Sequence, residues 1–239
     1  MQTTLAQFNE TQSPDAFALQ NSKLLKVHLD QVTVQAKLGS MVAYQGEVTF
    51  EHAGSGGMSR MLKKAVSGEG TSLMKVTGSG EVFLADTAQD IHLIYLEDDK
   101  ITVNGPNLLA FDSGIDWDIE RVQGASGMMG GGLFNTSLSG SGWVAVLSDG
   151  PPVLLNVASA PTFADAQAAI TWSSGVTTSV KTDVNVKTLI GRGSGETVQM
   201  GFQGQGWVLV QPSEGRVSGA PASGGGSGGG GLLGNVLGG

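Results

Sequence analysis

Apolar and polar residues alternate along this chain in short runs, with the two-residue period of half-buried β-strands. The segments 24–29 and 180–186 show this alternation clearly. The segments 91–96 and 153–157 are more continuously apolar, as expected for strands that are covered on both faces. Gly, Asn and Asp cluster between the runs and supply the positive-φ positions that tight turns need. The pattern predicts an all-β protein.

The tripeptide Gly-x-Gly, followed each time by β-forming residues, occurs three times. The copies begin at Gly78, Gly140 and Gly204, so the two intervals between them are nearly equal. Glycine within a strand marks a bulge or the close approach of another backbone. Because the motif returns at a near-constant interval, it predicts three copies of one sheet-forming unit.

Two further features recur upstream of each Gly-x-Gly. An aromatic residue that is soon followed by glycine occurs as Tyr44, Phe111 and Trp172, and the last two are separated by nearly the same interval as the glycine motifs. Ahead of each aromatic residue lies another short strand candidate, at 32–34, 101–103 and 161–163. These features support the same threefold division.

We therefore divide the chain into five parts. They are an N-terminal segment (1–22), unit 1 (24–87), unit 2 (90–149), unit 3 (151–211) and a C-terminal tail (215–239). The three units are expected to form one compact domain, as three tandem β-sandwich units in a pseudo-threefold arrangement.

Two segments depart from the strand pattern. The stretch 59–66 predicts a short helix, because Met61, Leu62 and Ala65 fall on one side of it. Glycine supplies about half of the positions in 215–239, so this tail is expected to be flexible. The apolar residues near its end, within 232–237, leave a weak docking motif as the alternative.

Composition and charge narrow the functional classes. The formal net charge of −8 disfavours a general nucleic-acid-binding protein, because phosphate backbones are repelled. The absence of cysteine excludes disulfides, thiol nucleophiles and thiolate metal sites. The stretch 1–21 contains no Lys or Arg and no apolar core, and no apolar run reaches the ~18 residues of a membrane span. We expect a cytoplasmic protein with no transmembrane segment.

Acidic residues supply two candidate sites. Asp112-Ser113-Gly114 matches the tripeptide of aspartic proteases, which need two carboxylates that share a proton. The corresponding positions in the other units hold Gln45 and Ser173, so a turn is the better interpretation. Asp112, Asp116, Asp118 and Glu120 form the densest acidic cluster. Oxygen ligands of this kind suit hard cations, but a solvated strand face is favoured.

Other candidate chemistry is weaker. His28, His52 and His92 are spread singly, without a metal-binding spacing. The glycine-rich 191–195 lacks the Lys-Ser/Thr of a phosphate-binding loop. Trp143 and Trp207 share a repeat position, where Glu81 stands in unit 1, and are expected to be core or interface residues rather than base-stacking platforms. No catalytic, metal-binding or cofactor-binding residue is assigned, and no cofactor is expected.

Three segments resemble a known family. The stretch 39–48 (GSMVAYQGEV) resembles the signature of the altered-inheritance-of-mitochondria family of bacterial and fungal proteins. The stretches 108–111 (LLAF) and 204–208 (GQGWV) resemble its central and C-terminal elements. The likeness covers about residues 22–212.

This resemblance implies a fold similar to the subunit of the tryptophan-binding RNA attenuator, present three times per chain. Three chains would then close into a ring of nine units. The family has no assigned enzymatic activity, so no functional positions are carried over. Its fungal member is implicated in the organisation of the mitochondrial inner membrane, which hints at a scaffold, and the lack of a transit peptide indicates a bacterial relative. RNA binding is not implied, because a shared fold does not carry function.

Three functional hypotheses follow. The first is a non-enzymatic structural or interaction protein that acts as a homotrimeric ring, since ring closure removes exposed sheet edges. The second is a module that binds a small ligand or peptide in clefts between units, with adaptable surfaces lined by Met58, Met61, Met128 and Met129. The third, ranked last, is an uncharacterised hydrolase that uses the acidic cluster at 112–120.

Overall fold

The computed structural model describes residues 4–52, 72–121, 134–181 and 199–213. The predicted helix at 59–66 and the predicted flexible tail at 215–239 lie outside these residues. Within them, strands make up most of the structure, and helical geometry is confined to two 3₁₀ turns, η1 (Leu5–Phe8) and η2 (Gly105–Asn107). The all-β class is therefore confirmed.

Each unit consists of three chain segments, which we name first, second and third in chain order. In unit 1 they are β2 (Leu24–Lys37), β3 (Met41–His52) and β4 (Leu73–Leu84). In unit 2 they are β5 (Asp90–Asn104), β6 with β7 (Leu108–Asp112, Asp116–Arg121) and β8 (Phe134–Ser148). In unit 3 every segment is divided, into β9 with β10 (Val153–Asn156, Thr162–Asp165), β11 with β12 (Ala169–Ser173, Val176–Lys181) and β13 with β14 (Gln199–Gly204, Trp207–Val210).

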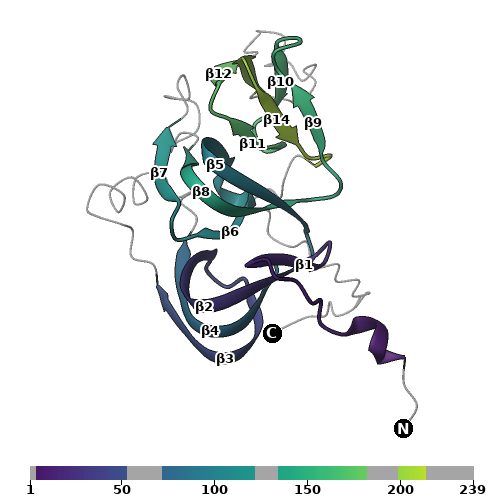
Figure 1. Cartoon of the computed structure of the whole chain (residues 1–239). Helices are drawn as coiled ribbons and strands as arrows, with labels where there is room; N and C mark the ends of the chain where they lie inside the picture. The colour runs from purple at the N-terminus through teal and green to yellow at the C-terminus, as the bar shows by residue number, and fades with distance from the viewer. Residues whose placement is uncertain (1–3, 53–71, 122–133, 182–198, 214–239) are drawn as a thin grey trace, which may run out of the picture.

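The units have the same strand order. In each, the third segment lies between the first and the second, and all pairings are antiparallel. The main sheet runs β3-β4-β2-β6-β8-β5-β11-β14-β9, which reads second, third, first three times over. Figure 1 shows the result as three tiers, with β2–β4 below, β5–β8 in the middle and β9–β14 above. The likeness of a unit to the attenuator subunit stays a prediction.

Neighbouring units are joined by one repeated strand pairing. The first segment of unit 1 pairs with the second segment of unit 2, where Gln35 lies opposite Phe111. The first segment of unit 2 pairs with the second segment of unit 3 in the same way, and Thr102 lies opposite Trp172. The apolar core crosses both junctions: Leu109 of unit 2 packs in a cluster of unit 1 residues, and Ile170 of unit 3 packs with unit 2.

The predicted close approach at Gly-x-Gly is present in all three units. The six glycines of these motifs all have positive φ, between 119° and 148°. At Gly80, where φ is 146°, a Cβ atom would overlap the carbonyl oxygen of Gln45 on the neighbouring strand. The second segment thus crosses the third at a distance that a side chain would prevent.

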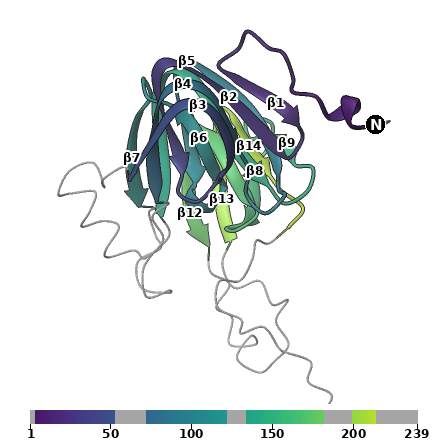
Figure 2. The same cartoon turned by 90° about the horizontal axis from the view of Figure 1, so that it is seen from below.

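The N-terminal segment is more ordered than the division at residue 22 indicated. Strand β1 (Phe17–Asn21) pairs with the start of β2, and Phe17 is buried in the core. Ahead of it, Lys26 binds Glu10 over 2.6 Å and donates to the carbonyl oxygen of Thr11. The carboxylate of Glu10 raises the pKa of this nearly buried Lys26. Beyond this attachment the chain, with η1, projects from the sheets (Figure 2).

The strand predictions were right in position and wrong in one property. The runs 24–29 and 91–96 lie in β2 and β5, and the described part of 180–186 lies at the end of β12. The runs 91–96 and 153–157 were both expected to be covered on both faces, but Tyr95 of β5 is 51% exposed, and Val153 and Leu154 of β9 are exposed as well. For β9 the reason is that it is the last strand of the sheet order, with no neighbour beyond it in the described chain.

Replacing Gly80 by Ala should destabilise the fold severely, because the new Cβ meets backbone at a φ that L-residues rarely adopt. We expect a loss of about 3 kcal/mol or more in the free energy of unfolding, measured by denaturant titration. Gly39→Ala is the matched control: φ is +86° there, but nothing lies within 4 Å of the new atom. Its cost should be about 1 kcal/mol. Equal losses in the two variants would contradict the role of close approach.

Candidate functional site

Asp112 acts as a backbone anchor in this structure. The backbone N–H of Trp143 donates to Oδ2 of Asp112 over 2.6 Å, beside the glycine at 142. Burial raises the pKa of the Asp112 carboxyl, and the hydrogen bond from Trp143 opposes this shift in part. Unit 3 repeats the contact, since the N–H of Trp207 donates to Oγ of Ser173 over 3.1 Å. Because Ser173 makes the same contact at the equivalent position of unit 3, the geometry of the repeat explains why an acceptor stands at Asp112. No second carboxylate is needed for this role.

The acidic cluster does not converge on one point. Asp116, Asp118 and Glu120 are exposed along one face of β7, and Ile115 and Ile119 point to the other side and are buried. Asp112 belongs to a different strand, β6. In the described ranges, no three His, Asp or Glu side chains come close enough to hold a metal ion. The cluster is the solvated strand face that the sequence favoured.

Trp143 and Glu81 lie at equivalent positions of their units, as the repeat predicts, and each contacts a residue of the neighbouring strand. His28 bonds Glu81 across the β2–β4 pair at 2.8 Å. At the same positions of unit 2, Tyr95 makes an edge-to-face contact with Trp143, with ring centroids 5.0 Å apart. His92 contacts the Ser148 hydroxyl at 2.7 Å, and its pKa is lowered by burial.

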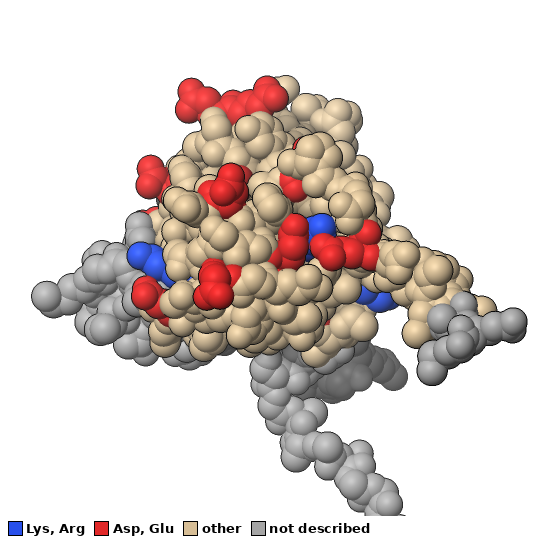
Figure 3. Space-filling view, turned by 60° about the horizontal axis from the view of Figure 1, so that its bottom comes forward, with Lys and Arg blue, Asp and Glu red and all other residues tan. Residues whose placement is uncertain are grey.

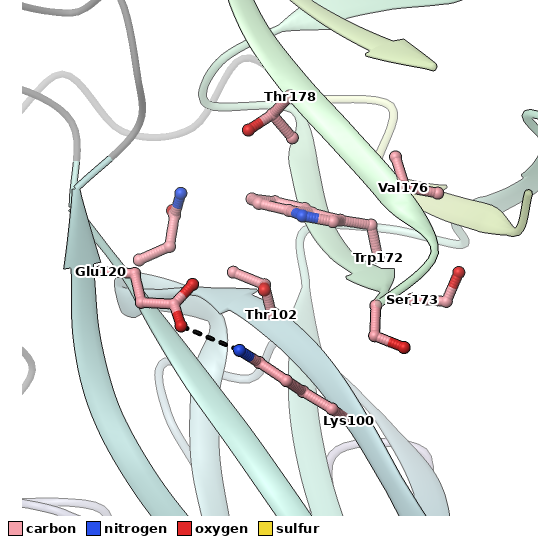
Figure 4. Close-up of a pocket in the computed structure, with 9 residues that line it drawn as sticks. Lys100, Thr102, Glu120, Trp172, Ser173, Val176 and Thr178 are labelled. Atoms are coloured by element: carbon pink, nitrogen blue, oxygen red, sulfur yellow. Dashed lines mark hydrogen bonds and ion pairs between the residues drawn. The ribbon is translucent and has the colours of Figure 1, made fainter. Parts of the chain in front are cut away.

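A cavity lies at the junction of unit 2 and unit 3 and is the strongest candidate site. Its volume is about 160 Å³. Both units contribute to its lining, which includes Lys100, Thr102, Glu120, Asn135, Trp172 and Thr178. Figure 4 shows the indole of Trp172 and the hydroxyl group of Thr178 on one side and the Lys100–Glu120 pair on the other.

The lining combines one ion pair, several neutral polar groups and one aromatic wall. Nζ of Lys100 lies 2.9 Å from Oε1 of Glu120, and both side chains are about half exposed. Their opposite charges offset one another, so the pair contributes little net charge to the cavity. Asn135 is buried, while the Trp172 ring packs edge-to-face on Phe202 with centroids 5.4 Å apart. This arrangement can bind a small polar molecule.

The sequence patterns did not single out this cavity. Trp172 was recognised only as a repeat marker and Glu120 only as part of an acidic cluster. Lys100, Asn135 and Thr178 carried no signal, because they come from three strands that the fold brings together. One clue was present in the sequence. When unit 3 is aligned with unit 2, Thr178 stands at the position of Trp117.

Comparison with known proteins gives one family. The model of the mitochondrial biogenesis AIM24 family matches residues 17–213. The chain belongs to the AIM24 family. The match includes β1, and thus begins earlier than the resemblance drawn from the sequence motifs.

The AIM24 fold of this chain is also found in a solved structure. A bacterial protein from Streptococcus pyogenes, determined by X-ray crystallography, superposes with a TM-score of 0.67 at 24% sequence identity. The superposition covers 82% of this chain and 91% of the other. At this identity the similarity concerns the fold alone. No curated protein gives a significant match, and none of the described helices is long and apolar enough to cross a bilayer.

The raised pKa of Asp112 predicts a pH dependence of stability. A carboxyl with a higher pKa in the folded state binds its proton more tightly there, so its stabilising contribution is complete below about pH 4 and is lost as the pH rises through the folded-state pKa. Asp112→Asn keeps an acceptor for the Trp143 N–H and removes the titration. As the pH rises from 3.5 to 8, the denaturant midpoint of the unmodified protein should therefore fall relative to the midpoint of this variant.

Asp116→Asn, on the exposed face, controls for the loss of one negative charge. Parallel pH profiles for the unmodified protein and the Asp112 variant would show that the buried carboxyl does not have the higher pKa.

Proposed function

We propose that this protein is a non-enzymatic structural or interaction protein that acts as a ring of three identical chains in the bacterial cytoplasm. The two ends of its strand order support the proposal. The order starts with β3, a second segment, and ends with β9, a first segment. Inside the chain, those two kinds of segment pair with each other at both unit junctions. The first segment at the end of one chain can therefore pair with the second segment at the beginning of the next chain.

The observation that carries the proposal is the exposure of β3. Val42 and Tyr44 are 57% and 49% exposed. Their equivalents in unit 2, Leu109 and Phe111, are both 0% exposed, since the preceding unit covers them. The equivalents in unit 3 are buried too, namely Ile170 and Trp172. Unit 1 has the same apolar surface and no preceding unit within the chain.

The opposite end exposes the complementary surface. Phe163 of β10 is 44% exposed and occupies the register position of Gln35 and Thr102. Repeating the internal junction between chains would place Tyr44 of one chain opposite Phe163 of the next. The exposed Val153 and Leu154 of β9 lie at the same end.

Ring closure is favoured because a head-to-tail interface leaves no strand edge open. An interface between two different surfaces yields either a closed ring or an open filament, and the latter keeps two apolar edges in water. Burying large apolar side chains contributes about 1.5–3 kcal/mol each. The number of three chains comes from the resemblance to the attenuator-like rings.

Surface charge supports a protein or small-molecule partner rather than nucleic acid. On the face shown in Figure 3, acidic side chains are scattered over the surface and basic ones are few. The net charge of −8 opposes the binding of phosphate backbones.

A second candidate function is the binding of a small ligand, and the cavity between unit 2 and unit 3 favours it. It is compatible with a ring, because the lining belongs to a single chain. The hydrolase hypothesis has less support, since the Asp112 carboxylate is engaged by backbone, Glu120 pairs with Lys100, and Asp116 and Asp118 are exposed.

Light scattering after size-exclusion chromatography tests the ring. At micromolar concentration we expect a particle three times as heavy as the single chain, whose mass is 24.4 kDa. Tyr44→Glu and Phe163→Glu should each reduce it to one chain, because a charge would be buried at the interface. Tyr95→Glu alters an aromatic residue of similar exposure, 51%, away from both ends and should leave the mass unchanged. A one-chain mass for the unmodified protein would refute the proposal.

Cross-linking tests the register. The chain has no cysteine, so the double variant Tyr44→Cys with Phe163→Cys can form disulfides only through the introduced thiols. The two positions lie at opposite ends of the strand order within a chain, whereas directly opposed residues of an antiparallel pair have the Cα separation of a disulfide. Oxidation should give linked species of two and three chains. The pair Tyr44→Cys with Tyr95→Cys should give none, and equal cross-linking in both pairs would contradict the register.

A further inference from the structure

We infer that the cavity between unit 2 and unit 3 binds a small neutral polyhydroxylated molecule, of the class of a single pyranose sugar or a cyclic polyol. The inference deepens the second candidate function and does not depend on ring assembly. Three features of the cavity carry it: its origin in a local departure from the repeat, an amide that is open to the cavity and has no described protein partner, and the offset charges.

The cavity exists because unit 3 lacks an aromatic residue that the other units have. Tyr44 and Phe50 form an edge-to-face pair in unit 1, with centroids 5.3 Å apart. Phe111 and Trp117 form the corresponding pair in unit 2. In unit 3 the first member is Trp172, but the register position of Phe50 and Trp117 holds the smaller Thr178.

The same comparison shows that the lining has become polar. Asn135 stands five residues before Gly140, and Leu73 stands five residues before Gly78 in unit 1. Leu73 is buried in the apolar cluster that contains Phe111 and Trp117, so the junction between unit 1 and unit 2 is filled. At the junction between unit 2 and unit 3, an amide and a hydroxyl group replace these apolar groups around a hollow.

Asn135 supplies a hydrogen-bonding group that is open to the cavity. The residue as a whole is only 6% exposed, and no hydrogen bond joins its side chain to a described residue. Nearly all polar groups in the interior of folded proteins are paired with protein or water. Because Asn135 lines the cavity, a molecule there can both donate to and accept from its amide.

The charge and hydrogen-bonding groups of the lining select a neutral ligand. Among the described residues of the lining, the charged side chains are Lys100 and Glu120, and these already bind each other. The remaining polar side chains, such as Thr102 and Thr178, both donate and accept hydrogen bonds. Adjacent hydroxyl groups on a ring match this mixture, whereas a net anion or cation would have to compete with the ion pair.

Shape and size point to one ring. A volume near 160 Å³ has room for several ordered water molecules, and therefore for a ligand of about the size of one sugar ring. Trp172, which is only 4% exposed, closes one side of the cavity, and the hydroxyl groups of a pyranose can reach the polar groups of Asn135 and Glu120.

Calorimetry and saturation-transfer NMR with glucose, galactose, mannose, N-acetylglucosamine and myo-inositol test the inference. We expect at least one of them to bind with a dissociation constant at or below the millimolar range. Asn135→Leu and Thr178→Trp introduce the residues of the filled junction and should weaken binding at least tenfold. Thr178→Val removes one hydroxyl at constant shape and should weaken it several-fold, which covers the case in which the Trp variant does not fold. Asn156→Leu, at an exposed asparagine outside the cavity, is the matched control and should bind normally.

Two results would overturn the inference: no saturable binding of any of these compounds to the folded protein, or equal binding by the unmodified protein and both cavity variants. Binding of acetate or glycine alone would also refute the neutral ligand class. The one-chain variant Tyr44→Glu should still bind the sugar, because the cavity is formed within one chain. Failure of the ring and failure of this site are thus separable.

Discussion

The whole structure depends on one pairing: the second segment of a unit lies against the first segment of the unit before it. An isolated unit of three strands would leave an apolar surface and a row of backbone groups in water. The pairings β2–β6 and β5–β11 cover that surface twice, and the residues concerned, such as Phe111 and Trp172, are buried there. The chain has three units but only two internal junctions, so Tyr44 and its neighbours stay exposed at β3. The oligomer we propose is the third junction, made between chains.

Within each unit the strands pack through a core of apolar side chains, and the second segment crosses the third at a close backbone approach. Gly-x-Gly lets the second segment cross the third, and a side-chain acceptor fixes the crossing in two of the units. Asp112 and Ser173 perform this task with different chemistry, since both need only an oxygen atom to accept an N–H. A residue that looks catalytic in a tripeptide motif is therefore explained by the geometry of its repeat.

Positions at which one unit differs from the other two are the candidates for functional sites. The two internal junctions share strand register, but their fillings differ: Leu73 and Trp117 close one junction, while Asn135 and Thr178 leave the other polar and hollow. Likewise Glu81 replaces the tryptophan of the other units and joins Lys26, His28 and the N-terminal segment in a charged cluster. A threefold repeat allows the three units to be compared with one another. A residue that differs from its two equivalents does not serve the structural role that those two share.

The sequence by itself determined the β class, the number of units and the crossing points, because each is a local property. Strand periodicity and a glycine that must adopt positive φ are visible in a few consecutive residues. The family resemblance was readable for the same reason, in the short segments around Tyr44 and Trp207. Only the tertiary structure decided how far the apolar strands are covered: Tyr95 in 91–96 is exposed, as are Val153 and Leu154 in 153–157, and burial depends on neighbours distant in sequence. The cavity was equally hidden, since Lys100, Asn135 and Thr178 become adjacent only when two units pair.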